Sequence, residues 1–322
     1  MKLLAKLSLS LLIGHSAWAF SASPVQLKIA DQKGNMRAQL EAADALKDLP
    51  YQIQWSEFPA AAPLAEALNA GAVDAGIIGD APLLFALAAG APVKAIAVDK
   101  SDPFGTALIV SEGSSLKTAQ DLKGKQIATG RGSIGHFVAL KALVQAGLTE
   151  KDVSFRFLGP VDAKVALANG SVDVWATWEP YTALAEIAGD KVLINGRGLW
   201  AGNSFLAATD TALNDPGKRQ ALQDYLNRLS QAQVWANQHV DAYSATLAKI
   251  IGFPQEAAKL SFARRKLAWQ AIDSATIEQQ QATADFYHAH QLIAAPLNVQ
   301  STFASGFSIP ALSTAQSAQP AQ

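Results

Sequence analysis

A repeat separated by about 99 residues is the feature of this sequence that most constrains its fold. The string ALNAGAVD at residues 67–74 returns as ALANGSVD at residues 166–173, 99 positions later. Upstream, IADQKG at residues 29–34 returns as IATGRG at residues 127–132, 98 positions later. One match between alanine- and glycine-rich strings arises easily by chance, whereas two matches at nearly one offset indicate a duplicated unit. We therefore expect two equivalent lobes.

Each copy reads as short apolar strands alternating with helices. The expected strands cover residues 27–30, 53–58, 75–78, 126–128, 153–158 and 174–177. The expected helices cover residues 36–46, 60–71, 135–146 and 162–170, with further helix starts near Gly79 and Trp178. Gly71 and Gly170 are typical C-terminal stop residues. Strands that alternate with helices indicate parallel α/β sheets, in which ligands bind beyond the carboxyl ends of the strands.

The first nineteen residues have the pattern of a cleaved secretory signal. Lys2 and Lys6 precede an apolar run over residues 7–13, and Ala17-Trp18-Ala19 has the small-x-small pattern of a signal cleavage site. The run is too short for a transmembrane anchor, which needs about 20 apolar residues. The sequence therefore predicts export to the periplasm without a stable membrane anchor.

Two strand-like runs, at residues 106–110 and 204–208, bracket the second copy. We expect the chain to leave the first lobe near residue 105 and to return near residue 206, so that two crossing strands form a hinge. After Asp210 the sequence reads as helical up to Ala289, and from Ser301 onward it is rich in Ser, Ala, Gln and Pro. The expected organisation is a signal at 1–19, lobe 1 at 20–104 and 207–300, lobe 2 at 105–206, and a flexible tail at 301–322.

Charge and cysteine content exclude several classes of protein. The 322 residues include 26 Lys+Arg, 27 Asp+Glu and no cysteine. This balance lacks the basic excess of a nucleic-acid binder. The absence of cysteine excludes disulfides, Cys-ligated zinc, iron–sulfur clusters and a thiolate nucleophile. Removal of the signal takes away two lysines and no acid, which leaves a net charge of −3.

Histidines give no support for catalysis or metal binding. His136 follows Ser133 by one helical turn, but no nucleophile-elbow pattern or orienting acid accompanies the pair. His288 and His290 are two residues apart on an expected helix, so they point to different faces and cannot chelate one metal well. We therefore expect neither an enzyme nor a cofactor or metal.

Four loops at the expected strand ends favour an anion as ligand, and they lie at residues 31–34, 79–82, 131–136 and 178–181. Each leads into a helix start, whose unpaired backbone N–H groups carry partial positive charge and bind sulfate, phosphate or carboxylate. In GRGSIG at residues 130–135, the glycines allow close backbone approach and Ser133 adds a hydroxyl donor. The string fits a dinucleotide fingerprint poorly. The structural alternative is a glycine turn with an ordinary helix cap.

Six separated motifs follow one another along the chain: DQKG at 31–34, WSEFPA at 55–60, GDAP at 79–82, DLKGK at 121–125, GS with His136 at 132–136, and WEPY at 178–181. In this order they resemble the aliphatic-sulfonate binding proteins of ABC importers, whose wider group includes nitrate and taurine binders. The resemblance runs from the signal to about residue 300. It implies a type II periplasmic binding protein with two similar α/β lobes, each a mixed sheet flanked by helices, joined by two hinge strands. Such a protein is a monomer that closes over its ligand and delivers it to ABC permease and ATPase subunits.

Carried over position by position, the resemblance implies a set of residues around the anion. They are Gln32, Gly79, Asp80, Ala81, Gly132, Ser133, Ile134, Gly135, Trp178, Glu179 and Arg264. Arg264 would supply a bidentate donor; the alternative is that it belongs to a solvated basic patch. An unpaired carboxylate repels a sulfonate, so Asp80 and Glu179 either cap their helices or contact the ligand's tail.

This sequence departs from the resembling family at Asp31, where an aromatic residue is common, and at Arg265 and Lys266, where prolines are common. These departures bear on which organic group the ligand carries. Trp175, Trp178, Trp200 or Trp269 could form an apolar wall against an alkyl or aryl tail. The sequence thus predicts capture of an alkyl or aryl sulfonate or a sulfate ester. The alternatives are a nitrate, taurine or bicarbonate binder, or an enzyme of cofactor-precursor biosynthesis on the same fold.

Overall fold

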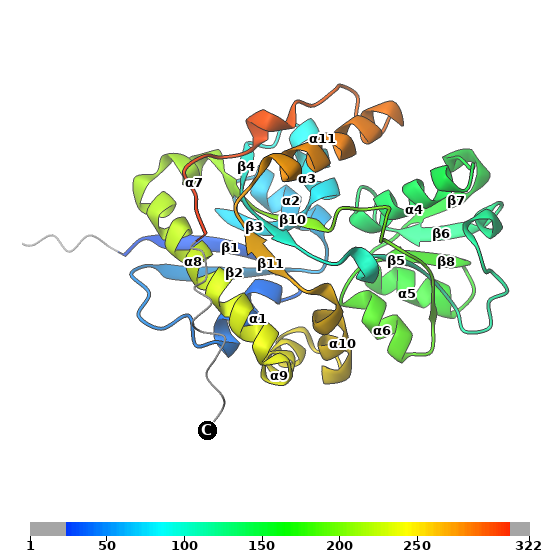
Figure 1. Ribbon diagram of the computed structural model, residues 1–322, viewed down its shortest axis with the longest axis horizontal. Helices are drawn as coiled ribbons and strands as arrows, with labels where there is room; N and C mark the ends of the chain where they lie inside the picture. The colour runs from blue at the N-terminus through cyan, green and yellow to red at the C-terminus, as the bar shows by residue number, and fades with distance from the viewer. Residues whose placement is uncertain (1–23, 310–322) are drawn as a thin grey trace, which may run out of the picture.

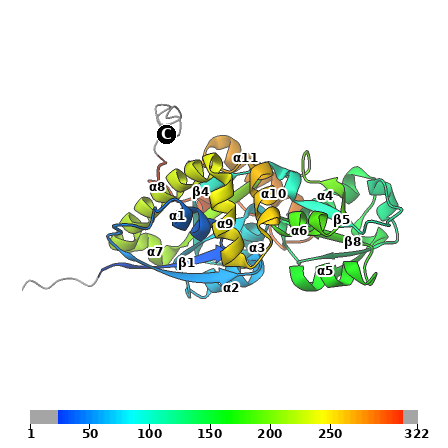
Figure 2. The same cartoon turned by 90° about the horizontal axis from the view of Figure 1, so that it is seen from below.

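The computed structural model describes residues 24–309 and forms two α/β lobes that lie end to end (Figures 1 and 2). The expected signal at 1–19 and residues 310–322 of the expected tail lie outside the described residues. Each lobe is built around one mixed sheet with helices on both faces. The two-lobed α/β fold predicted from the repeat is confirmed.

Lobe 1 contains a six-stranded sheet with the order β11-β4-β10-β3-β1-β2. The strands are β1 (Gln26–Gln32), β2 (Gln52–Phe58), β3 (Ala75–Gly79), β4 (Val93–Lys100), β10 (Asn203–Thr209) and β11 (Ala268–Gln270). β1 pairs in parallel with β2 and β3, whereas β10 is antiparallel to both β3 and β4. Two strands here, β4 and β11, were not expected from the sequence.

Lobe 2 repeats this topology in a five-stranded sheet with the order β7-β6-β8-β5-β9. The strands are β5 (Ala107–Val110), β6 (Gln126–Thr129), β7 (Ser154–Phe157), β8 (Val174–Thr177) and β9 (Lys191–Asn195). β6 is parallel to β7 and β8, and β5 is antiparallel to β8 and β9. The set β2-β1-β3-β10-β4 therefore corresponds strand by strand to β7-β6-β8-β5-β9.

Helices cover both faces of each sheet. They are α1 (Asn35–Ala42), α2 (Ala61–Asn69), α3 (Asp80–Ala88), α4 (Ile134–Gln145), α5 (Pro160–Ala168), α6 (Tyr181–Ile187), α7 (Asp210–Asn214), α8 (Pro216–Gln238), α9 (Val240–Ile251), α10 (Gln255–Arg265) and α11 (Ser274–Ala289). Along β1, Leu27 and Ile29 share a buried cluster with residues of α8, whereas Ala30 shares one with residues of α2. Figure 2 shows α8 and α2 on opposite sides of β1. This alternation is the period-two pattern of a strand that is buried on both faces.

The two crossings between the lobes lie at residues 101–106, which include a short 3₁₀ helix at Pro103–Gly105, and at residues 196–202; neither is the expected continuous strand. β5 lies wholly in lobe 2 and β10 wholly in lobe 1. The crossings run side by side, because the Ser101 backbone N–H and hydroxyl both donate to the Gly202 carbonyl oxygen, at 2.8 and 2.9 Å. Two adjacent short connections are the arrangement expected of a hinge.

The lobes also share an apolar contact on one side of the crossings. Phe85 on α3 and Tyr287 on α11 belong to lobe 1, and Phe137 on α4 belongs to lobe 2. The ring centroids of Tyr287 lie 4.8 Å from Phe85 and 5.5 Å from Phe137. The structure therefore brings the lobes together through packed side chains as well as through the chain crossings.

Residues 301–309 of the expected flexible tail pack on lobe 1 instead. The Ala304 backbone N–H donates to the Ala95 carbonyl oxygen at 2.9 Å, and the Phe303 ring lies 5.8 Å from Phe205. Phe303, Phe307 and Ile309 supply apolar surface that the Ser/Ala/Gln-rich composition concealed. Within residues 24–309, no helix is long and apolar enough to span a membrane.

Candidate functional site

A cleft lies between the lobes at the carboxyl ends of the parallel strands, with about 680 Å³ of space including its open mouth. Both lobes and both crossings contribute to its walls. Six of the residues predicted from the sequence line it: Gln32, Gly79, Ser133, Ile134, Trp178 and Glu179. Asp80, Ala81, Gly132, Gly135 and Arg264 were predicted with them, and the structure does not place these five in the lining.

The N-terminus of α4 presents hydrogen-bond donors to the cleft. Ser133 is its N-cap, and the Ser133 hydroxyl oxygen accepts from the His136 backbone N–H at 3.1 Å and lies 3.3 Å from the Thr129 hydroxyl. If Thr129 donates, both acceptor positions of Ser133 are filled and its own proton is left to donate. In the described part of the chain, the backbone N–H groups of Ile134 and Gly135 have no partner. These donors together suit an anion.

Gly132 and Gly135 allow α4 to approach its neighbours rather than lining the cleft. A Cβ on Gly135 would lie 2.6 Å from the Ala176 carbonyl oxygen of β8, closer than real Cβ atoms come. A Cβ on Gly132, whose φ is +69°, would lie 2.8 Å from the Phe85 ring across the lobes. Both glycines therefore set the position of the α4 N-terminus through close packing.

The N-terminus of α1 is already occupied by the protein's own carboxylates. Asp31 accepts from the backbone N–H groups of Gln32, Met36 and Arg37 at 2.8, 3.2 and 2.8 Å, and Glu57 accepts from Gly34 at 3.0 Å. Burial, followed by repulsion from Glu57, raises the pKa of Asp31 to about 7. The expectation that this loop offers its backbone N–H groups to the ligand is therefore wrong for these four donors.

Asp80 is held inside the protein at the start of α3. Its carboxylate accepts from the Trp200 indole N–H at 2.8 Å and from the Ala81 backbone N–H at 2.6 Å. Burial raises the pKa of Asp80 to about 7, opposed by these hydrogen bonds. Trp200 belongs to the second crossing, so the Asp80–Trp200 hydrogen bond links α3 to that crossing. The Asp80 carboxylate therefore has hydrogen-bond donors of the protein itself as partners.

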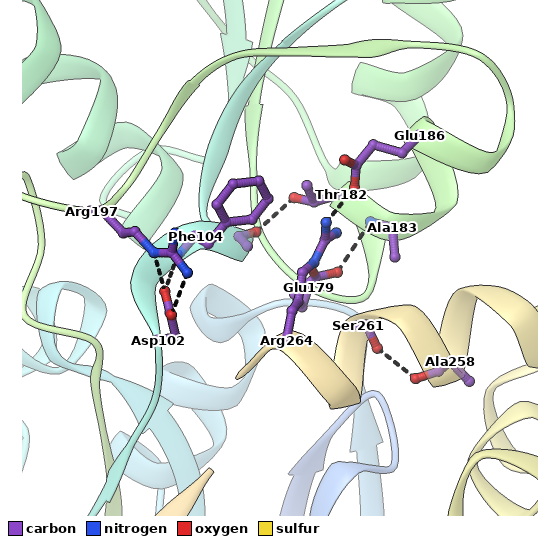
Figure 3. Close-up of polar contacts among 11 residues, drawn as sticks. Asp102, Phe104, Glu179, Thr182, Ala183, Glu186, Arg197, Ala258, Ser261 and Arg264 are labelled. Atoms are coloured by element: carbon purple, nitrogen blue, oxygen red, sulfur yellow. Dashed lines mark hydrogen bonds and ion pairs between the residues drawn. The ribbon is translucent and has the colours of Figure 1, made fainter. Parts of the chain in front are cut away.

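Glu179 and Arg264 form an ion pair between the lobes (Figure 3). Glu179 also accepts from the Ala183 backbone N–H at 3.1 Å, and Arg264 contacts Glu186 at 2.6 Å. Burial raises the pKa of Glu179, and Arg264 opposes that rise. Two carboxylates of lobe 2 engage the Nε and Nη1 of Arg264, whereas its Nη2 is buried without a partner among the described residues. Its expected role as a donor to the ligand stays a prediction.

The neighbouring crossing carries a second ion pair. Asp102 lines the cleft and binds Arg197 at 2.6 Å, and the hydrogen bond from Arg197 lowers the pKa of Asp102. The ring of Phe104 lies 5.1 Å from the Arg197 guanidinium carbon and 5.3 Å from that of Arg264 (Figure 3). Both carboxylates at the cleft, Asp102 and Glu179, are therefore neutralised by arginines.

Arg265, and not Arg264, is the arginine that lines the cleft. Its guanidinium has no carboxylate within ion-pair distance among the described residues. The sequence singled out Arg265 only as a departure from the resembling family. α10 ends here, because Lys266 turns to a left-handed conformation with φ of 49°. Arg264 and Arg265 are consecutive helical residues, so their side chains point in different directions, and Arg265 is the one that lines the cleft. Asn35 is another lining residue that the sequence did not suggest.

Two of the four candidate tryptophans reach the cleft. Trp178 and Trp200 line it, whereas Trp175 and Trp269 are buried and lie outside the lining. The indole N–H of Trp178 is buried without a partner among the described residues, so it remains available as a donor.

His136 is not arranged as a general base for Ser133. Its ring Nδ1 accepts from the Gly132 backbone N–H at 3.3 Å, and its ring packs edge-on against Phe155 and Phe157. Burial, followed by the charge of Arg131, lowers the pKa of His136 to about 4. The imidazole is therefore neutral and structural. Over residues 24–309, no cluster of three or more His, Cys, Asp or Glu side chains is suited to a metal ion.

Comparisons with known proteins agree with this architecture. A family model described as an ABC-transporter phosphonate periplasmic substrate-binding protein matches residues 47–250. An Escherichia coli (strain K12) protein named for aliphatic sulfonate binding is 34% identical over 307 residues, which cover 93% of this chain and 96% of the relative. A Bacillus subtilis (strain 168) protein of the same name is 29% identical, covering 87% of this chain and 82% of the relative.

Solved structures give the same result. The alkanesulfonate-binding protein SsuA from Xanthomonas axonopodis pv. citri, bound to MOPS, has a TM-score of 0.82 at 32% identity, covering 88% of this chain and 99% of that one. SsuA from Escherichia coli has a TM-score of 0.80 at 32% identity, covering 90% and 95%. The desulfurization enzyme DszB, at 16% identity and a TM-score of 0.59, shares the fold alone.

Proposed function

Because this chain belongs to the periplasmic aliphatic-sulfonate-binding proteins of ABC transporters, we propose that it captures an organosulfur anion and delivers it to an ABC importer. The ligand class is an alkyl or aryl sulfonate or a sulfate ester. The permease and ATPase subunits receive the ligand from a monomeric, exported form that has lost residues 1–19.

The donor-rich cleft is the observation that carries this proposal. A sulfonate stays ionised at biological pH and offers only acceptors, so it suits the α4 N-terminus, the Ser133 hydroxyl and the Trp178 indole N–H. Asp102 and Glu179 leave no uncompensated negative charge there, because each is paired with an arginine. Arg265 adds a guanidinium to the cleft wall in a chain whose formal net charge is −1.

A panel of ligands tests the proposal by titration calorimetry. We expect binding of alkyl or aryl sulfonates or sulfate esters to exceed that of nitrate, bicarbonate, taurine and sulfate. Tight nitrate binding without any response to organosulfur anions would replace this function with the nitrate alternative. Turnover of a bound ligand by the purified protein would support the enzyme alternative.

Ser133→Ala is expected to weaken sulfonate binding by about 1–3 kcal/mol, because it removes a hydroxyl donor to the anion. Titration calorimetry of the variant against the best sulfonate of the panel measures the change. Ser171→Ala, at an exposed serine of the same lobe, is the matched control and should bind like the wild type. Unchanged affinity in Ser133→Ala would remove this hydroxyl from the site.

Closure of the lobes is the second part of the proposal. Gly79 of lobe 1 faces Ile134 of lobe 2 across the cleft, and a Cβ on Gly79 would lie 2.8 Å from the Ile134 Cγ2. The Tyr181 hydroxyl of lobe 2 donates to the Pro59 carbonyl oxygen of lobe 1 at 2.9 Å. We infer that ligand contacts with both lobes favour this closed arrangement through motion about the two crossings.

Gly79→Val is expected to weaken ligand binding at least tenfold, because the added side chain meets Ile134 when the lobes close. A second substitution, Ile134→Ala, should restore most of the lost affinity by vacating that space. Calorimetry gives the affinities, and small-angle X-ray scattering reports whether ligand still compacts each variant.

Gly113→Val is the control, since nothing lies within 4 Å of a Cβ at that position. Equal weakening in Gly79→Val with and without Ile134→Ala would contradict closure at this contact.

A further inference from the structure

A second, smaller recess adjoins the cleft, with about 300 Å³ of space including its open mouth. It shares Gln32, Asn35, Glu179 and Arg265 with the cleft, so the two spaces are continuous at these residues. Lys33 adds a further side chain to its wall. We call this space the basic recess and define it by Gln32, Lys33, Asn35 and Arg265.

The basic recess carries two cations that form no short ion pair, although the charge of Lys33 acts on Glu57 and that of Arg265 acts on Asp99 and Glu179. Neither Lys33 nor Arg265 has a carboxylate within ion-pair distance among the residues that the structure describes. Glu179 is the acidic residue in the wall, and Arg264 engages it from outside the recess. The Lys33 ammonium lies 5.6 Å from the Tyr181 ring centroid and 5.2 Å from that of Phe253, which holds the charge beside the recess.

The polar groups left over in the recess are mostly donors. The Asn35 side-chain oxygen accepts from the Tyr243 hydroxyl at 3.3 Å, so its NH₂ group is left to bind elsewhere. The Ser261 hydroxyl donates to the Ala258 carbonyl oxygen at 3.0 Å (Figure 3). The Gln32 side chain has no hydrogen-bond partner within residues 24–309. Among the residues that line the recess, Glu179 is the one carboxylate, and Arg264 engages it; the NH₂ groups of Gln32 and Asn35 are left to donate.

We propose that the ligand carries a second anionic group, a carboxylate or a second sulfonate, which binds in the basic recess while its sulfonate binds at the α4 N-terminus. The proposal rests on the proposed function and specifies its ligand class. A plain alkyl tail would desolvate Lys33 and Arg265 without giving them a partner, which is unfavourable. An ammonium group on the tail would be repelled by the same two cations.

Matched pairs of ligands test this proposal on the wild-type protein. Titration calorimetry compares sulfoacetate, 3-sulfopropanoate and 4-sulfobutanoate with ethane-, propane- and butanesulfonate, and taurine supplies the ammonium-bearing member. We expect at least one sulfocarboxylate to bind at least tenfold more tightly than its matched alkanesulfonate. Taurine should bind more weakly than ethanesulfonate.

Variants locate the preference within the protein. Arg265→Gln and, independently, Lys33→Gln should reduce the ratio of sulfocarboxylate to alkanesulfonate affinity towards one. Lys191→Gln, whose ammonium binds the Glu112 carbonyl oxygen far from the cleft, should keep the wild-type ratio. A ratio that survives in both recess variants would overturn the assignment to these residues.

The outcomes separate this proposal from the one on which it depends. If alkanesulfonates bind as tightly as sulfocarboxylates, the second anionic group is wrong while organosulfur capture stands. If no member of either series binds, and no aryl sulfonate or sulfate ester of the first panel binds, both proposals fail.

Discussion

Replacing Arg264 by methionine is expected to lower the free energy of unfolding by about 3–5 kcal/mol at pH 7, because it leaves the buried Glu179 carboxylate without a partner. The Glu179 side chain is only 4% exposed, and Arg264 supplies its ion-pair partner. Methionine keeps much of the apolar stem of arginine, so the loss reports mainly on charge. Urea unfolding of the ligand-free protein, followed by circular dichroism, measures it.

The loss of unfolding free energy in Arg264→Met should depend on pH. Burial raises the pKa of Glu179 above its usual value of 4.5, and Arg264 opposes the rise. A carboxyl whose pKa is raised on folding favours the folded state at low pH, and this contribution is lost as the pH rises through the folded pKa. Without Arg264 the folded pKa rises further. The difference between variant and wild type should therefore be largest at neutral pH and shrink as the pH falls toward 4.5.

Two companion variants distinguish the ion pair from general loss of packing. Arg264→Met combined with Glu179→Gln should recover most of the lost stability, because no buried charge remains. Glu186→Gln should cost under about 1 kcal/mol, since that partner is more exposed and Glu179 still engages Arg264. A loss below 1 kcal/mol in Arg264→Met would mean that water reaches Glu179 in the ligand-free protein, with the lobes apart at this contact.

Gly135→Val is expected to lower the free energy of unfolding by about 3 kcal/mol, because the added side chain would push α4 away from β8. A Cβ there would lie 2.6 Å from the Ala176 carbonyl oxygen and 3.1 Å from the Thr177 backbone nitrogen. Both are backbone atoms of β8, which cannot rotate away as a side chain would. The same shift moves the donors of the α4 N-terminus, so sulfonate affinity should fall at least tenfold.

Urea unfolding and calorimetry on one preparation measure both effects of Gly135→Val. Gly113→Val is again the matched control, since the added side chain meets no atom within 4 Å of its Cβ. Wild-type stability in Gly135→Val would show that α4 tolerates displacement and that close packing does not fix the anion site.

The repeat predicted the fold well because matching strings occupy equivalent elements. Residues 67–74 end α2 and lead to β3, and residues 166–173 end α5 and lead to β8. β4 and β9 correspond to each other in topology, but they lie outside the matched strings, so the duplication gave no sign of them. β11 has three residues at a sheet edge, and its pairing with β4 depends on tertiary contacts rather than on local pattern.

The site was predicted less completely, because side-chain direction is a tertiary property. The sequence identified Ser133 and Trp178 in the lining, but it exchanged Arg264 for Arg265. The two arginines are neighbours at the end of α10, and the packing of that helix decides which of them faces lobe 2 and which faces the cleft. The helix-start rule also overlooked Asp31, an acid four residues before α1, which fills the donors that the rule assigned to the ligand.

The position of β10 has a consequence for the order in which the chain can complete its structure. All five strands of the lobe 2 sheet lie within residues 107–195, so this lobe is complete before β10 is made. β10 then inserts between β3 and β4, pairing Ser204 with Gly79 and Asn203 with Lys100. Until that insertion, β3 and β4 present unpaired edges, which are sites for wrong pairing between chains. Lobe 1 is thus the last to finish. A nascent chain that stops before residue 203 has a complete lobe 2 and a lobe 1 sheet that lacks β10.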